Sequence, residues 1–250
     1  MIRPQQKMTL IQHFMELRRR IIWVLLFLVV MFGIGLYIAP QLQAFMTAPL
    51  MAAWAGDGGQ MIYTNLTDGL FVQFALATLF AIFTTLPFLL FQAWAYAAPG
   101  LKPRERRFIG PVLILSPALF LAGAAFAYYV LFPMVFKFFI NLNQHAPVPT
   151  AFFPSVTNYL SFIIDLLRTF GLAFQLPLVM VLLNRIGILS RKSAMRAWRY
   201  VVVGAFIFSA FFVPPDVLSQ TMLAVPLIAL YFSGVVFMRR EQGAGTRDGK

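Results

Sequence analysis

The chain has 250 residues, of which 60% are hydrophobic and only 11% are charged. Soluble domains carry about 25% charged residues and tolerate exposed apolar patches of only a few hundred Å². The composition excludes a soluble enzyme, a disordered chain and a nucleic-acid-binding domain, and predicts a protein whose apolar side chains face lipid. The net charge of +12 would suggest a nucleic-acid partner in a soluble protein, so its meaning depends on where the basic residues lie.

Six apolar runs follow one another along the chain, and a bilayer core needs about 20 apolar residues of helix. They are unbroken and lack the roughly 10-residue alternation of a membrane β-barrel, so we expect helices. The predicted spans cover about residues 21–39, 70–97, 109–132, 156–183, 200–213 and 217–238. The fifth run is short, because its length at 1.5 Å per residue is about 21 Å, less than the roughly 30 Å of the hydrocarbon core.

Basic residues mark one side of the membrane. Of the 20 Lys and Arg, 18 fall in four blocks, at residues 3–20, 102–107, 185–199 and 239–250. The alternate connections contain Lys137 as their one basic residue. The positive-inside rule then predicts six spans with cytoplasmic N- and C-termini. The fifth run must cross the membrane, since otherwise the last two blocks would lie on opposite sides. The charge therefore indicates topology, and we expect no nucleic-acid partner.

This pattern predicts a single polytopic membrane domain over residues 1–238 and a disordered cytoplasmic tail over 239–250. The first run shows no small-residue cleavage pattern, so we expect a retained anchor and not a signal peptide. We expect the outer connection 133–155, which holds Pro147, Pro149 and Pro154, to be stiff and irregular. The outer connection 40–69 has an apolar stripe that we expect to lie in the membrane interface. The stripe consists of Leu42, Phe45, Met46 and Leu50.

Sequence motifs for enzyme chemistry are missing. The chain has no cysteine and two histidines, His13 and His145, and it lacks the HExxH, GxSxG and GxxxxGK[ST] patterns. These observations argue against a catalytic zinc site, a nucleophilic serine and a nucleotide-binding loop. We therefore expect a protein that is not an enzyme and that holds no metal or other cofactor.

Two acidic residues each stand alone inside a basic block: Glu16 in the sequence HFMELRRR and Glu105 in KPRERR. One interpretation is local neutralisation, because Glu16 can pair with Arg19 or Arg20 at helical spacing. The functional interpretation is that two carboxylates at the cytoplasmic membrane surface bind an arginine-bearing peptide. Arginine suits such a site because its planar guanidinium forms two parallel hydrogen bonds with a carboxylate.

Polar groups within the predicted spans are few. Asp165 and Arg168 are three residues apart in the fourth span, and we expect them to form an ion pair on one helical face. Gln175 lies deeper in the same span, and a lone glutamine there should face other helices or a watery cavity. Helices in lipid tolerate proline as a kink. Four spans contain one, namely Pro87, Pro117, Pro177 and Pro226.

Six stretches carry a resemblance to a known family. They are HFMELRRR at 13–20, APL at 48–50, PFLLFQAWAYAAPGLKPRERR at 87–107, AFAYYVLFP at 125–133, FGLAFQLPLVMVLL at 170–183 and PPDVLSQ at 214–220. In this order, on a plan of six spans, the sequence resembles the TatC family, the receptor subunit of the twin-arginine protein translocase, over about residues 8–238. The resemblance implies six helices in a concave, glove-like bundle. It also implies the receptor and core subunit of a Sec-independent translocase that exports folded proteins.

The resemblance implies roles for individual residues. Glu16 and Glu105 would hold the paired arginines of a twin-arginine signal peptide, and Arg18, Tyr96 and Leu101 would line or support that patch. Tyr96 stands where the family often has phenylalanine.

Positions away from that patch also match the family. Pro49 and Asp216 match outer-side positions, and Gln175 and Gln220 match intramembrane or partner-docking positions. The partners implied are TatA- and TatB-like single-span subunits, lipid, and further copies of the chain within a larger complex. The implied location is the bacterial cytoplasmic (inner) membrane, and the implied energy source is the proton-motive force.

Two positions depart from the family pattern. Gln175 stands where many members have a glutamate, so this position cannot titrate, and Val213 replaces a common threonine.

The sequence leaves two other functions open. A small secondary transporter for an ion or metabolite would need an intramembrane acid, for which Asp165 is the one available. A scaffold would capture other membrane subunits without binding a peptide.

Overall fold

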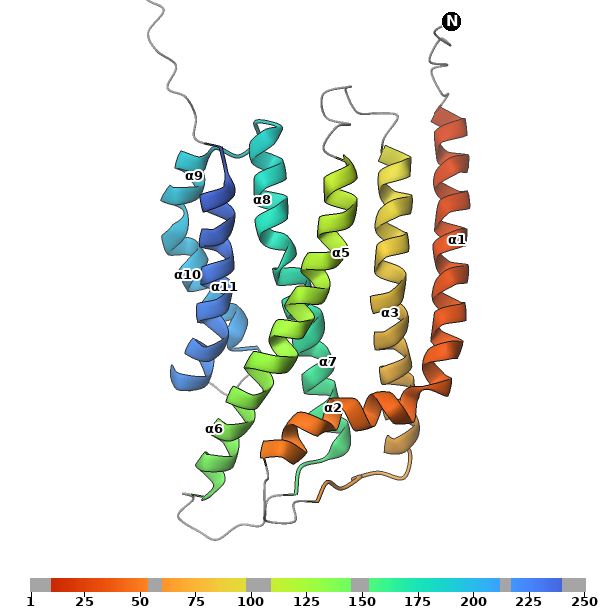
Figure 1. Ribbon diagram of the computed structural model, residues 1–250, viewed down its shortest axis with the longest axis vertical. Helices are drawn as coiled ribbons and strands as arrows, with labels where there is room; N and C mark the ends of the chain where they lie inside the picture. The colour runs from red at the N-terminus through yellow and green to blue at the C-terminus, as the bar shows by residue number, and fades with distance from the viewer. Residues whose placement is uncertain (1–9, 54–59, 98–108, 145–152, 212–216, 240–250) are drawn as a thin grey trace, which may run out of the picture. The chain divides into compact units, whose positions relative to one another are not determined.

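The structure, a computed structural model, is almost entirely helical where it is described (Figure 1). The described residues are 10–53, 60–97, 109–144, 153–211 and 217–239. Within these ranges the only pairing of extended backbone is one parallel bridge, between Ile62 and Ser155. This confirms the all-α fold class predicted from the long unbroken apolar runs.

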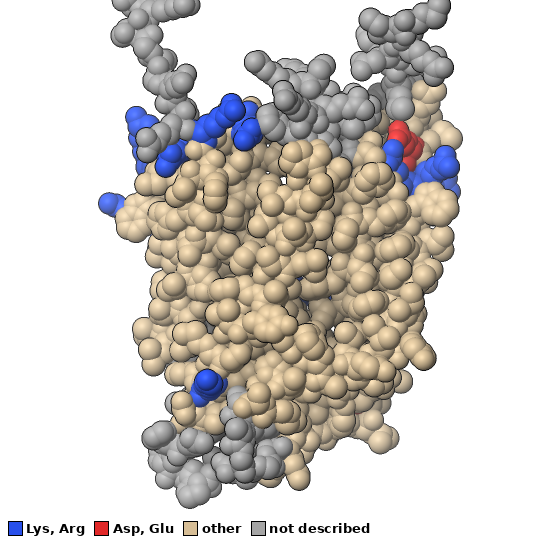
Figure 2. Space-filling view, in the orientation of Figure 1, with Lys and Arg blue, Asp and Glu red and all other residues tan. Residues whose placement is uncertain are grey.

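The helices follow the chain in the order α1 (Leu10–Tyr37), α2 (Ala39–Ala53), α3 (Asp68–Ala97), α5 (Ile109–Phe126), the π-helical segment η2 (Ala127–Leu131), α6 (Phe132–Gln144), α7 (Val156–Ala173), α8 (Gln175–Arg185), α9 (Arg191–Arg196), α10 (Trp198–Ser209) and α11 (Val217–Phe237). Five helical stretches of the described chain are long and apolar enough to cross a membrane, namely Ile11–Tyr37, Asp68–Ala93, Gly110–Asn141, Val156–Arg185 and Gln220–Phe237. In Figure 2, most visible Lys and Arg side chains gather at helix ends, and the surface along the helices is largely uncharged.

The short fifth run corresponds to α10, a shorter apolar helix at Trp198–Ser209. Backbone hydrogen bonds from Ala197 to Ser193 and from Val201 to Ala197 carry the helical path from α9 into α10. Three of the six residues of α9 are basic, so α9 adds no apolar length and the fifth run is as short as the sequence predicted.

The chain divides into two compact units, one of residues 1–42 and 73–117 and the other of residues 43–72 and 118–250. In the first unit α1 and α3 pack antiparallel: the rings of Phe27 and Phe88 lie 4.9 Å apart, and those of Phe32 and Phe74 lie 6.0 Å apart. The single-domain organisation expected from the sequence stays a prediction. Except for Arg239, the predicted tail lies outside the described residues.

In the second unit, the predicted irregular connection 133–155 is wrong in its first part. The helix of the third span continues through η2 into α6 and ends at Gln144. Pro133 has no N–H to donate to the carbonyl of Tyr129, and a proline ring clashes with that carbonyl in a regular α-helix. The wider π-turn, in which the Phe132 N–H reaches the carbonyl of Ala127, absorbs this disruption without ending the helix.

The predicted connection 40–69 also begins as a helix, α2. Two members of its apolar stripe, Met46 and Leu50, are 7% and 3% exposed inside the second unit, so they pack against protein and not lipid. Phe45, by contrast, is 48% exposed. The interface prediction was wrong for the two buried residues because their packing partners come from residues far along the chain, which periodicity alone does not reveal.

A proline also accounts for the break between α7 and α8. Pro177 cannot donate to the carbonyl of Ala173, and α7 ends at that residue. Before the break, α5 and α7 approach closely through glycines. A Cβ on Gly123 would lie 2.3 Å from the carbonyl oxygen of Phe170, and a Cβ on Gly171 would lie 2.7 Å from the ring of Phe120. Small residues at such crossings allow helices in lipid to pack.

Two glycines of α1 give a matched test of the packing between α1 and α3. A Cβ on Gly35 would lie 2.9 Å from the backbone of Ala77, whereas a Cβ on Gly33 would meet nothing within 4 Å. We expect Gly35→Ala to lower the free energy of unfolding by about 1–3 kcal/mol through overpacking. Gly33→Ala should be neutral or slightly stabilising, because alanine favours helix. Unfolding in detergent by SDS titration measures both, and equal effects would contradict the close approach.

Candidate functional site

The N-terminal part of α1 and the C-terminal part of α3 bring together two of the residues predicted for the binding patch, Glu16 and Tyr96. A third, Arg18, is on the same stretch of α1 but is exposed and does not line the cavity at Glu16. This follows from helix geometry, because residues two apart do not face the same way. Leu101 and Glu105 lie outside the described residues.

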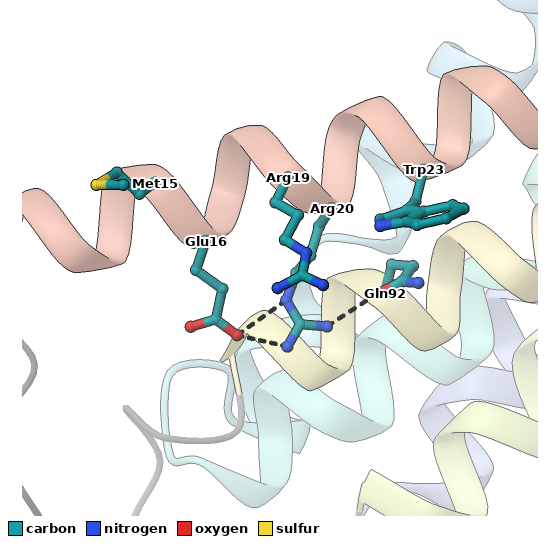
Figure 3. A pocket seen from close by; sticks show the side chains of 6 residues that line it. All are labelled: Met15, Glu16, Arg19, Arg20, Trp23 and Gln92. Atoms are coloured by element: carbon teal, nitrogen blue, oxygen red, sulfur yellow. Dashed lines mark hydrogen bonds and ion pairs between the residues drawn. The ribbon is translucent and has the colours of Figure 1, made fainter.

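Glu16 is paired with Arg20, one of the two partners that helical spacing allowed. The Arg20 Nη2 and Nε atoms both donate to Oε1 of Glu16, at 2.5 and 3.0 Å (Figure 3). The remaining terminal nitrogen, Nη1, donates to Oε1 of Gln92 on α3, at 2.9 Å. The side chains of Glu16 and Arg20 are 25% and 23% exposed, so water and ligands still reach the pair. One guanidinium therefore joins the carboxylate of α1 to the amide of α3.

A cavity of about 490 Å³ opens beside this pair. Its lining residues are Met15, Glu16, Arg19, Arg20, Trp23 and Gln92 (Figure 3). One carboxylate and two guanidiniums give the cavity wall a net positive charge. Glu16 carries the one negative charge of this lining, so it is the lining residue that attracts a cationic ligand most strongly.

A second, mostly apolar groove of about 370 Å³ lies between α1 and α3. Its lining residues are Leu17, Arg20, Ile21, Val24, Leu25, Leu89, Gln92, Ala93 and Tyr96. Arg20 and Gln92 line both the polar cavity and the apolar groove. The hydrogen bond between their side chains therefore lies at the boundary of the two. Tyr96 closes the groove near the N-terminal end of α1, where its ring stacks on His13 with centroids 4.2 Å apart.

Sequence reasoning missed Gln92 and Trp23. Gln92 lies 72 positions from Arg20, and only the antiparallel packing of α1 on α3 brings the two together. A signal was present, since a lone glutamine near the end of an apolar run should find a polar partner on another helix.

Pro49, predicted as a structural outer-side residue, lies inside α2. A proline there cannot donate to the carbonyl of Phe45, four residues earlier. The hydroxyl of Tyr128 donates to that carbonyl at 2.7 Å, and its ring stacks on Phe45 at 4.4 Å. Next to it, the Tyr159 hydroxyl donates to the carbonyl of Met46 at 2.9 Å. Two tyrosines thus fix α2 at the point where proline disrupts its hydrogen bonds.

Other predicted polar residues fall in the second unit. Arg168 and Asp165 approach to 3.9 Å, which confirms the ion pair expected from their spacing. Gln175 begins α8 directly after the helix break and is half-buried, as is Gln220 in α11. Asp216 lies outside the described residues. Among the residues the structure describes, no group of three or more acidic, histidine or cysteine side chains could hold a metal ion.

The spans and the paired carboxylate together define a class: a multispan α-helical membrane protein with a polar cavity at one end of its first span. The family model described as "Sec-independent protein translocase protein (TatC)" matches residues 12–226. The chain belongs to this family. It is accordingly a subunit for protein transport and not an enzyme.

Individual relatives support this assignment. The TatC protein of Haemophilus influenzae is 38% identical over 92% of this chain and 88% of its own length. That of Escherichia coli K12 is 37% identical over 94% of this chain and 90% of its own. A crystal structure of the twin-arginine translocase receptor TatC in DDM is similar with a TM-score of 0.80 and 29% identity, covering 91% of this chain and 99% of that one.

The Tyr128 hydroxyl and Pro49 can be tested as a coupled pair. Tyr128→Phe keeps the ring stack but leaves the Phe45 carbonyl without its donor, which should cost about 1–3 kcal/mol of unfolding free energy. In a Pro49→Ala background, residue 49 regains an N–H and Tyr128→Phe should cost much less. The four proteins of this cycle are compared by SDS unfolding in detergent. Strictly additive losses would contradict the pairing.

Proposed function

We propose that this chain is the receptor and core subunit of its translocase, binding twin-arginine signal peptides at the cytoplasmic face. The observation that carries the proposal is the Glu16 carboxylate, set in an open cavity beside an apolar groove. A secretory signal peptide has a positively charged region followed by an apolar region of about 7–15 residues. The polar cavity suits the first region and the apolar groove suits the second.

The chemistry of Glu16 suits arginine in particular. A carboxylate with both oxygens within reach binds a guanidinium through two parallel hydrogen bonds, whereas an ammonium is a point charge without this geometry. Glu105 supplies the second carboxylate of the proposal, one for each arginine of the pair. Arg18, Tyr96 and Leu101 complete the patch by family resemblance, and the Tyr96 ring at the edge of the groove supports a place for it there.

The distribution of charge supports the proposed orientation. Arg18–Arg20 lie near the N-terminal end of α1. The basic residues between Arg191 and Arg199 lie in α9 and in the first turn of α10. Basic residues near span ends favour the cytoplasmic side. We place both termini in the cytoplasm of a bacterium and the chain in its inner membrane, with Pro49 and Asp216 on the outer side.

The proposed complex contains single-span TatA- and TatB-like subunits and further copies of this chain, and it exports folded cargo with the proton-motive force. Half-buried amides in spans are suited to bonding between helices. Gln175 and Gln220 are therefore the proposed docking positions for single-span partners. A small-solute transporter is less well supported, because Asp165, its candidate acid, is paired with Arg168.

Removing the charge of Glu16 tests the proposed function. We expect Glu16→Gln to weaken binding of a fluorescent twin-arginine signal peptide to the purified chain at least tenfold, since a charge-assisted pair contributes about 1.5–3 kcal/mol. Glu16→Gln combined with Glu105→Gln should abolish crosslinking of the peptide. Fluorescence anisotropy in detergent or nanodiscs measures the first effect.

Asp165→Asn is the matched control, because it also removes one negative charge and one ion pair with an arginine. It should leave peptide affinity unchanged. Persistent crosslinking in the double variant, or equal loss of affinity in the control, would overturn the proposed site.

A further inference from the structure

The carboxylate proposed to receive a peptide arginine already holds an arginine of the chain itself. Arg20 uses two of its nitrogens on Glu16, and no other described side chain donates to that carboxylate. A peptide guanidinium that binds Glu16 therefore meets a competitor with the same functional group, tethered four residues away on the same helix. Because the competitor is intramolecular, it is present at every peptide concentration.

Gln92 gives the competitor a second attachment. Its side-chain oxygen accepts a hydrogen bond from Nη1 of Arg20 at 2.9 Å, so the guanidinium is held from α1 and from α3 at the same time. A surface ion pair at helical spacing contributes little by itself. The added bond to a partner helix fixes the guanidinium in the orientation in which it covers Glu16.

The contact between Arg20 and Glu16 is nevertheless incomplete. Both donated hydrogen bonds end on Oε1, and the described residues provide no donor to Oε2. An incoming guanidinium can engage both oxygens in the parallel arrangement that makes arginine–carboxylate pairs strong. A lysine ammonium cannot reproduce this fork. Arginine is thus better suited than lysine to displace Arg20.

We propose that Arg20, held by Gln92, is an intramolecular competitor that occupies Glu16 in the resting receptor and must leave it before a peptide arginine binds. This inference rests on the proposed function, in which Glu16 receives a peptide arginine. On displacement Arg20 keeps Gln92 as a partner, so its charge is not left without a hydrogen bond. The occupied pair lowers the affinity for every cation by one common factor, so only a cation that binds Glu16 strongly, as arginine does, overcomes it.

The test compares a labelled twin-arginine signal peptide with the same peptide carrying two lysines, on the purified full chain in nanodiscs. For Arg20→Gln we expect the twin-arginine peptide to bind several-fold tighter, in keeping with the loss of one ion pair and one hydrogen bond of competition. The twin-lysine peptide should gain by the same factor, because displacing Arg20 costs the same free energy whichever cation replaces it, so the ratio of the two affinities should stay unchanged. Gln92→Leu should change both affinities in the same direction by a smaller factor, and it should add nothing to Arg20→Gln.

Arg19→Gln is the matched control. Arg19 lines the same cavity and carries the same charge, but Glu16 is paired with Arg20 and not with it. Removing Arg19 lowers the local positive potential but leaves the pair that covers Glu16 intact, so the gain in affinity should be clearly smaller than for Arg20→Gln. Circular dichroism and the melting temperature of each variant show whether it is folded, and Arg20→Lys provides a milder change with an intermediate gain expected.

The possible outcomes distinguish a failure of this inference from a failure of the proposed function. If wild type and Arg20→Gln both fail to bind the twin-arginine peptide, the proposed function is overturned, and the inference with it. If wild type binds but Arg20→Gln binds equally or more weakly, the inference alone is overturned, and Arg20 is a structural partner of Glu16. An equal gain of affinity in Arg19→Gln would likewise overturn it, since charge alone would then explain the effect.

Discussion

A helix in lipid has no water to satisfy a backbone carbonyl that loses its donor, and this constraint shapes the chain at three of its prolines. The structure accommodates these three prolines in three different ways. The carbonyl that Pro49 cannot satisfy receives the hydroxyl of Tyr128. The disruption at Pro133 is absorbed by a π-helical turn, and Pro177 is accommodated by a break centred on Phe174. The bends of the second unit therefore follow from which N–H groups are missing from the sequence.

The scarcity of water in the membrane also determines how the acidic side chains are partnered. The described chain contains three: Glu16 accepts hydrogen bonds from Arg20, Asp68 accepts from the backbone N–H groups of Thr64 and Asn65, and Asp165 forms a looser ion pair with Arg168 at 3.9 Å. A cation that binds at Glu16 would exchange one set of donors for another and would not fill an empty site. The affinity at such a site is set by the difference between two similar pairs, so it is lower than an unoccupied carboxylate would give.

Features that depend on local spacing could be predicted from the sequence. The helical class, the long spans, the Asp165–Arg168 pair and a partner for Glu16 within one turn all follow from composition and periodicity. Features that depend on distant residues could not. Gln92 joins the site through the antiparallel register of α1 and α3, and α6 exists because a π-turn tolerates Pro133. The roles of Leu101, Glu105 and Asp216 stay predictions, since these residues lie outside the described ranges.

The exposure of α1 has a consequence for the site that it carries. Only 6% of its most apolar window is buried, so the described part of this chain covers little of the helix surface. From Ile21 to Tyr37 the apolar stretch measures about 25 Å at 1.5 Å per residue, near the thin end of biological bilayers. In a thicker bilayer this stretch is too short to span the hydrocarbon core, so the turn containing Arg20 lies below the headgroups and its long side chain extends outward to reach water. Membrane thickness is thus a physical variable that acts on the same ion pair that a ligand would have to open.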